Sequence, residues 1–117
     1  MEISELIRMQ IESDKKRGFK VEFASDHERE EQLNRETVGL IGEVGEFANL
    51  LKKVSLTLTT EGYEGPSLSE ASSELREELA DAVIYIIRLS TILGGVLEND
   101  ILEKMEKNDK RYGYLEG

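Results

Sequence analysis

The chain has 117 residues, and its 25 acidic and 15 basic side chains give it a formal net charge of −10. This length suits one domain, and we expect residues 1–117 to form it. The charge argues against non-specific binding to nucleic acid or to an anionic membrane, because both require a basic surface. The chain has no cysteine, which excludes disulfides, thiolate nucleophiles and thiolate metal sites.

The N-terminal segment MEISELIRMQ lacks the basic and apolar regions of a secretory signal. No segment reaches the roughly 18 consecutive apolar residues of a membrane span. We therefore expect a soluble, cytoplasmic protein.

Apolar periodicity predicts two helices in the first half of the chain. The first covers residues 2–16 and ends at Gly18; its apolar side consists of Ile3, Leu6, Ile7 and Ile11. The second begins near Ser25 or Asp26, where a capping oxygen and an acidic first turn suit the positive end of the helix dipole. It is predicted to reach about Val54.

The main connection is predicted at residues 55–73, where Gly, Ser and Thr concentrate around Pro66, the single proline of the chain. Residues 56–60 alternate in a way that would suit a short strand. An isolated strand has no pairing partner, however, so we predict a loop there. A lid, an oligomer contact and a passive connection all remain open as the role of this segment.

Two further helices are predicted after this connection. Ser67 or Ser69 caps the third helix, which runs to Leu93 and stops at the pair Gly94–Gly95. The fourth covers about residues 98–112. The sequence therefore predicts an all-α fold, a four-helix bundle whose core is enlarged by homo-oligomerisation.

Two pairs of carboxylates, each spaced three residues apart, border the apolar stripes of the second and third helices. They are Glu43 with Glu46 and Glu78 with Asp81. On adjacent antiparallel helices the four charges would repel one another strongly unless a cation lay among them. An all-oxygen ligand set favours Mg²⁺, Mn²⁺ or Ca²⁺ over zinc.

The first pair lies in the glycine-rich stretch GLIGEVGEF, residues 39–47. Each of Gly39, Gly42 and Gly45 costs about 1 kcal/mol relative to alanine in a helix interior. A helical wheel places Gly39 and Gly42 on the carboxylate side. We therefore predict that a bulky group or another backbone approaches this surface closely.

A di-iron carboxylate bundle is the main alternative for acidic helices. It needs Glu-x-x-His on two helices. The single histidine, His27, follows Ala24 by three residues, so the sequence lacks this motif. A P-loop is also absent, because no glycine-rich loop ends in Gly-Lys-Ser or Gly-Lys-Thr.

The fourth helix carries Lys104, Asn108 and Arg111 on one polar stripe. Salt bridges with neighbouring glutamates would explain these cations if they stood alone. Beside a metal–carboxylate cluster, a lysine and an arginine suit the faces of a polyphosphate that the metal does not cover.

Taken in order, these motifs resemble the MazG-like all-α nucleoside triphosphate pyrophosphohydrolases, a group that includes dCTP pyrophosphatases and phosphoribosyl-ATP pyrophosphohydrolases. The family pattern is E-E-x-x-E, then E-x-x-D, then a lysine, an asparagine and an arginine. The matching positions are Glu43, Glu46, Glu78, Asp81, Lys104, Asn108 and Arg111. Gly42 replaces the first glutamate, as in dCTP pyrophosphatase-like sequences, which also have a tyrosine at the position of Tyr85.

The resemblance implies hydrolysis of a nucleoside triphosphate between its α and β phosphates, in a homodimer or a dimer of dimers. It implies Mg²⁺, with Mn²⁺ as an alternative, bound by the catalytic carboxylates Glu43, Glu46, Glu78 and Asp81. Tyr85, Lys104, Asn108 and Arg111 would bind the substrate. Which carboxylate is the general base stays open.

The identity of the base and sugar is also open. Phe19 and Phe23 suit either stacking on a base or packing after the first helix. A different class of protein remains as the alternative, namely a non-catalytic acidic helical adaptor or a divalent-ion-binding protein. Release of pyrophosphate from a nucleotide separates the enzyme from this alternative.

Overall fold

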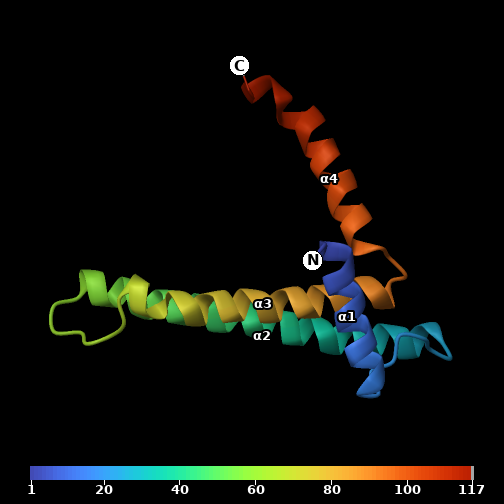
Figure 1. Cartoon of the computed structure of the whole chain (residues 1–117). Helices are drawn as coiled ribbons and strands as arrows, with labels where there is room; N and C mark the ends of the chain where they lie inside the picture. Colours follow the sequence, from blue (N-terminus) through green and yellow to red (C-terminus); the bar gives the residue numbers. More distant parts are fainter. Residues whose placement is uncertain (117) are drawn as a thin grey trace. The chain divides into compact units, whose positions relative to one another are not determined.

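A computed structural model describes residues 1–116 of the chain. The described part contains four α-helices and a short 3-10 helix, and no strand (Figure 1). The prediction of an all-α fold is confirmed. The elements in chain order are α1 Ile3–Lys16, α2 Asp26–Thr59, α3 Leu68–Ile92, α4 Leu97–Tyr112 and η1 Gly113–Glu116.

Serine side chains begin the two long helices. Ser25 Oγ accepts a hydrogen bond from the backbone N–H of Glu28 at 3.2 Å. Ser67 and Glu70 form a reciprocal capping box, because the N–H of Glu70 donates to Ser67 Oγ and the N–H of Ser67 donates to the Glu70 carboxylate. Both caps lie at predicted positions.

Glycines in the left-handed region end α1 and α3. Gly18 has φ of 84°, and the N–H of Phe19 donates to the carbonyl of Asp14 at 2.8 Å. Gly94 has φ of 76°, and the N–H of Gly95 donates to the carbonyl of Ser90 at 2.9 Å. These are Schellman motifs, which satisfy carbonyl groups that a helix end leaves free.

The connection between α2 and α3 is shorter than predicted, because residues 55–59 and 68–73 are helical. The prediction of a loop over residues 55–59 is therefore wrong. The hydroxyls of Ser55, Thr57 and Thr59 each donate to the carbonyl four residues earlier. Such bonds let polar residues remain inside a helix, and the buried Val54 anchors the last turns.

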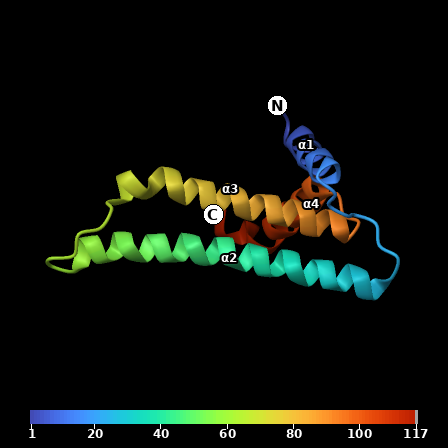
Figure 2. The ribbon, with the colours of Figure 1, turned by 90° about the horizontal axis from the view of Figure 1, so that it is seen from below.

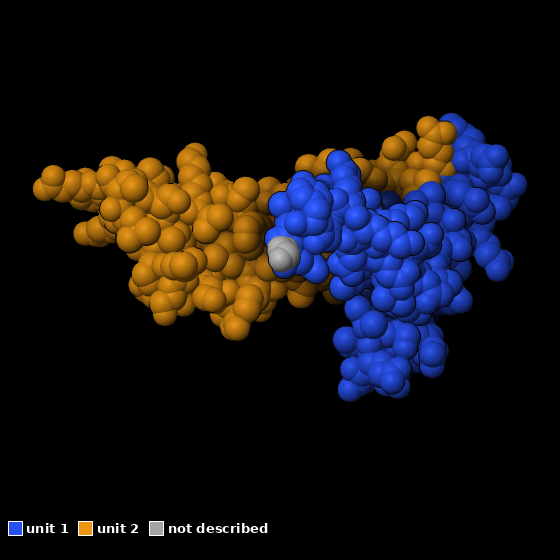
Figure 3. Space-filling view, turned by 90° about the horizontal axis from the view of Figure 1, so that it is seen from above, with its two compact units in different colours: residues 1–29, 87–117 blue, residues 30–86 orange. Residues whose placement is uncertain are grey.

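The chain divides into two compact units (Figure 3). Unit 1 consists of Met1–Arg29 and Ile87–Gly117, and unit 2 consists of Glu30–Ile86.

In unit 2, the segments of α2 and α3 lie side by side and run antiparallel (Figures 1 and 2). Their main apolar cluster lies toward the connection between the two helices. Its buried members are Val54, Ala71 and Leu75, with Phe47 and Leu50 packed against them. This cluster fixes the spacing of the two helices one to three turns from the carboxylate pairs.

In unit 1, a buried ion pair joins α1 to the end of α3. The Arg88 guanidinium donates two hydrogen bonds of 3.0 Å to the Asp14 carboxylate, which also accepts one from Gln10 at 2.9 Å. The ring of Phe19 lies 5.2 Å from the same guanidinium. Phe19 therefore has a packing role here, one of the two roles that the sequence left open.

No single helix in residues 1–116 is long and apolar enough to cross a membrane, although α3 and the following helical segment pass the length and composition test when taken together.

Candidate functional site

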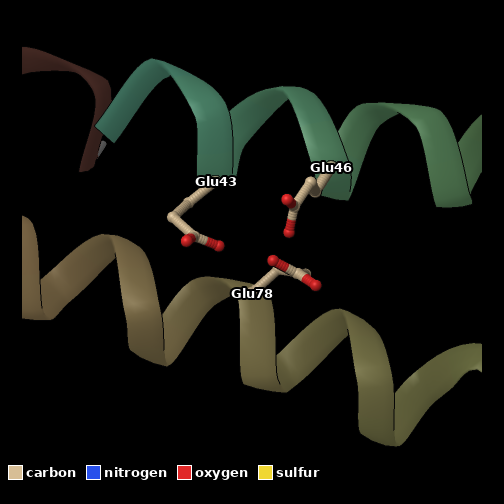
Figure 4. Close-up of side chains that lie close together, drawn as sticks. All are labelled: Glu43, Glu46 and Glu78. Atoms are coloured by element: carbon tan, nitrogen blue, oxygen red, sulfur yellow. The ribbon is translucent and has the colours of Figure 1, made fainter. Parts of the chain in front are cut away.

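Three glutamates converge between α2 and α3 in unit 2 (Figure 4). Glu43 and Glu46 project from successive turns of α2, and Glu78 projects from α3 toward both of them. Each offers a carboxylate oxygen, and these oxygens all lie within 4.8 Å of one another. The i, i+3 spacing on α2 therefore places two charges against one charge of the neighbouring helix.

The two half-buried glutamates each hide an oxygen that lacks a partner. Oε2 of Glu43 and Oε2 of Glu78 are buried and accept no hydrogen bond from any described residue. Glu46, by contrast, is exposed. A buried carboxylate oxygen without a donor is costly, so the arrangement favours a bound cation or a bound proton.

The pKa of Glu78 is raised from 4.5 to about 7. The largest cause is the Glu43 carboxylate, which would accept a hydrogen bond from a protonated Glu78, followed by the Glu46 carboxylate in the same way, and burial and the two neighbouring negative charges add to it. Three ionised carboxylates can only accept hydrogen bonds, so a proton on Glu78 supplies the missing donor. A divalent cation would compete for the same place.

The residues present fit a hard divalent cation. All three ligand groups are carboxylates, and Mg²⁺ and Mn²⁺ prefer oxygen. The two partnerless buried oxygens are consistent with ligand positions.

Asp81 lies one turn after Glu78 on α3 and is exposed. It does not belong to the group of converging carboxylates, so three of the four residues predicted as ligands come together. Its assignment as a ligand stays a prediction.

Tyr85 packs against Gly39. A Cβ atom at position 39 would overlap the Tyr85 ring, so only glycine leaves room for that side chain. The bulky group predicted to approach the glycine surface is therefore, at Gly39, a tyrosine from α3. This contact holds the tyrosine one turn of α2 away from Glu43.

Gly42 and Gly45 have a different environment. A Cβ atom at either position would meet no described atom within 4 Å, apart from its neighbours in the helix. The close approach predicted at Gly42 has no counterpart within the described chain, and there it stays a prediction.

Lys104, Asn108 and Arg111 lie on α4, in unit 1, and all three are exposed. The Arg111 guanidinium lies 5.1 Å from the ring centroid of Tyr112. α4 has no buried residue, which agrees with a polar stripe that faces solvent or a ligand. The predicted phosphate contacts stay a prediction.

The structure also places two residues near the glutamates that the sequence reasoning did not assign. Asn49 and Lys53 line a depression of about 180 Å³ in unit 2 together with Glu46, Leu50, Glu74 and Glu78. Their spacing from Glu46, three and seven residues, was a usable signal, because it places them on the same face of α2.

Comparison with known proteins gives one consistent result. The chain is 33% identical to human dCTP pyrophosphatase 1 over 100 residues, which cover 82% of this chain and 56% of the human protein. The rat and mouse proteins of the same name are 31% and 32% identical over the same length. The chain thus spans little more than half the length of these relatives. No family model matches the chain, and no solved structure matches it significantly.

Proposed function

We propose a function from the premise that this chain is a homologue of dCTP pyrophosphatase 1, a MazG-like nucleoside triphosphate pyrophosphohydrolase. The proposed reaction is the hydrolysis of a nucleoside triphosphate to a nucleoside monophosphate and pyrophosphate. The reaction depends on Mg²⁺. The substrate is a deoxynucleoside triphosphate or a non-standard nucleotide, and dCTP is the first candidate because of the names of the relatives.

One observation carries the proposal, namely the convergence of Glu43, Glu46 and Glu78 from two helices. Scattered surface acids would point away from one another, because like charges at short range destabilise a fold. Here two of the carboxylates also bury an oxygen that lacks a donor. Three converging carboxylates, on a chain related to dCTP pyrophosphatases, are evidence in favour of a metal-dependent reaction at phosphate.

The carboxylates would hold a divalent ion and orient the attacking water. Glu43, Glu46 and Glu78 would bind Mg²⁺, with Asp81 as the fourth proposed ligand. When bound, Mg²⁺ neutralises charge on the phosphates and lowers the pKa of water. One carboxylate also accepts the proton of the attacking water, as a general base within hydrogen-bonding distance can.

Tyr85, Lys104, Asn108 and Arg111 are the proposed substrate-binding residues. The Tyr85 hydroxyl is a hydrogen-bond donor from the same helix as Glu78, and its ring is positioned by Gly39. Lys104 and Arg111 stabilise negative charge as pyrophosphate leaves, and Asn108 donates from its amide.

We further propose that the active form is a homodimer or a dimer of dimers. Unit 2 exposes large apolar side chains with helical spacing: Ile41, Val44 and Leu51 on α2, and Leu79, Val83 and Ile86 on α3. Val44, Leu79 and Val83 are 54%, 51% and 50% exposed. Several large exposed apolar side chains on one helix pair are typical of an interface rather than of a monomer surface.

Light scattering coupled to size exclusion tests the oligomer. The wild-type protein is expected to elute as a dimer or tetramer, and Val83→Asp is expected to elute as a smaller species, because an aspartate in an apolar interface is left unpaired. A monomeric wild-type protein would contradict this part of the proposal.

Product analysis tests the reaction. The purified chain is incubated with Mg²⁺ and separate nucleotides, including dCTP and dUTP, and the products are separated by anion exchange. We expect a monophosphate and pyrophosphate, and loss of both after chelation of the metal. A diphosphate and orthophosphate as primary products would contradict the proposed bond cleavage.

Binding of Mg²⁺ with no product from any nucleotide would instead favour the alternative, a divalent-ion-binding protein or acidic adaptor. An increase in melting temperature on addition of Mg²⁺, in the absence of nucleotide, measures this binding.

A further inference from the structure

Lys53 is a cation beside the glutamates and forms no ion pair with any residue that the structure describes. It lines the same depression as Glu46, Glu74 and Glu78. No described carboxylate lies within ion-pair distance of its ammonium group, whereas the described ion pairs elsewhere include Lys20 with Glu28 and Lys107 with Glu103. Lys53 is exposed, and ion pairs between exposed side chains are weak, so its ammonium group is available to a ligand.

The depression continues the glutamate site along α2. Glu46, Asn49 and Lys53 follow one another at spacings of three and four residues, so they share one face of the helix. The seven-residue step from Glu46 to Lys53 rises about 10 Å. A ligand that occupies both the glutamate site and the depression would lie along this face of α2 and reach Lys53.

The chemistry of the depression indicates which part of a ligand would lie there. Its polar lining consists of an ammonium group, an amide and three carboxylates, and its one apolar residue is Leu50. A neutral ring would gain little from such walls, whereas an anion bridged to a metal ion would find the ammonium on its uncovered side.

Within unit 2, Lys53 is the only cation among the residues that line this depression. Its place beside the glutamates is set by a single continuous helix and does not depend on unit 1, which carries Lys104 and Arg111.

We infer that Lys53 is a substrate-binding residue whose ammonium group contacts a phosphate oxygen of a metal-bound nucleotide, with Asn49 lining the approach. The inference rests on the proposed function for the metal and the nucleotide. It adds a cation that neither the motifs nor the relatives' names assign.

Equilibrium binding of dCTP in the presence of Mg²⁺ is the primary test, and the release of pyrophosphate is measured in parallel. Lys53→Met is expected to weaken dCTP binding about tenfold and to raise KM more than it lowers kcat, because a charge-assisted contact is lost. Lys53→Arg retains the charge and is expected to retain most of the affinity.

Lys52→Met is the matched control. Lys52 is the adjacent exposed lysine on α2, and it does not line the depression. Its replacement by methionine removes the same charge as the replacement of Lys53. It should bind dCTP like the wild-type protein. The difference between the Lys53→Met and Lys52→Met variants should shrink as the salt concentration rises, since exposed charges are screened.

The outcomes separate this inference from the proposed function. Pyrophosphate release with equal KM values for the two methionine variants overturns the role of Lys53 and leaves the proposed function intact. Binding of dCTP that is weakened only in Lys53→Met, without any hydrolysis, supports Lys53 and overturns the proposed activity. If the wild-type protein binds neither dCTP nor any other nucleotide of the product analysis, both are overturned.

Discussion

The pair formed by α2 and α3 in unit 2 is packed in two different ways along its length. Toward the connection between the helices, Val54, Ala71 and Leu75 are 3%, 2% and 6% exposed and form an apolar cluster. Toward the middle of α2, Glu43, Glu46 and Glu78 face one another across the same helix pair. The apolar cluster holds α2 and α3 together, whereas the negative charges of the carboxylate section repel one another.

The difference explains how three like charges can remain close. Burial of the apolar cluster stabilises the helix pair, because apolar surface removed from water contributes about 25 cal/mol per Å². When all three carboxylates are ionised, this packing holds them at short range against their mutual repulsion. The stability of the helix pair and the proposed metal binding therefore depend on different residues of the same two helices.

The largest expected effect comes from removing a charge of the carboxylate section. Glu78→Gln is expected to lower Mg²⁺-dependent pyrophosphate release by at least about 100-fold, because a proposed metal ligand is lost. It should also abolish the thermal stabilisation by Mg²⁺.

Glu77→Gln is the matched control for that variant, since Glu77 is the adjacent exposed acid on α3 and lies outside the converging group. Equal activity of the two glutamine variants would show that the carboxylate section has no special role.

The next effect concerns the apolar cluster. Leu75→Ala removes a buried side chain and is expected to destabilise the protein by about 2–5 kcal/mol. Leu58→Ala changes a side chain that is 80% exposed and is expected to cost less than about 0.5 kcal/mol. Urea unfolding of both variants measures the contrast. Similar losses would mean that the apolar cluster does not hold the helix pair.

A smaller effect on stability is expected from replacing the three glycines of α2 by alanine, and its sign differs between them. Gly42→Ala and Gly45→Ala are each expected to stabilise the protein by up to about 1 kcal/mol, because alanine favours the helix and the added Cβ meets open space. Gly39→Ala is expected to destabilise it, because the Tyr85 ring must move.

Thermal melts of the three variants test this order. Lower activity of the stabilised Gly42→Ala variant would support the predicted close approach of a ligand or partner at that position. A Gly39→Ala variant more stable than the wild-type protein would contradict the packing of Tyr85.

The smallest expected effect is a dependence of stability on pH in the absence of metal. The folded protein raises the pKa of Glu78 from 4.5 to about 7, so it binds more protons than the unfolded chain in this range. The stability contributed by the protonated carboxyl is complete below pH 4.5 and is lost as the pH rises through about 7. The amide of Glu78→Gln does not titrate, so the melting temperature of this variant should increasingly exceed that of the wild-type protein across the window. A constant difference would contradict the raised pKa.

The helices could be predicted because their signals are local. Ser25, Gly18 and Gly94 act within one turn of their own helix ends, and the structure places the helix ends beside them. The end of α2 could not be predicted in this way. Residues 55–59 have turn-like composition, and their helical state depends on Val54, which packs against α3.

The sequence by itself determined the four helices and the two carboxylate pairs, because helix period and capping depend on neighbours within a few residues. Only the tertiary structure decided which carboxylates meet, since Glu78 joins the glutamates of α2 while Asp81 does not belong to that group. It also paired Asp14 with Arg88, 74 residues later, and placed Lys53 beside the glutamates. These contacts depend on the register between helices, which side-chain packing sets over a long sequence separation and no local pattern specifies.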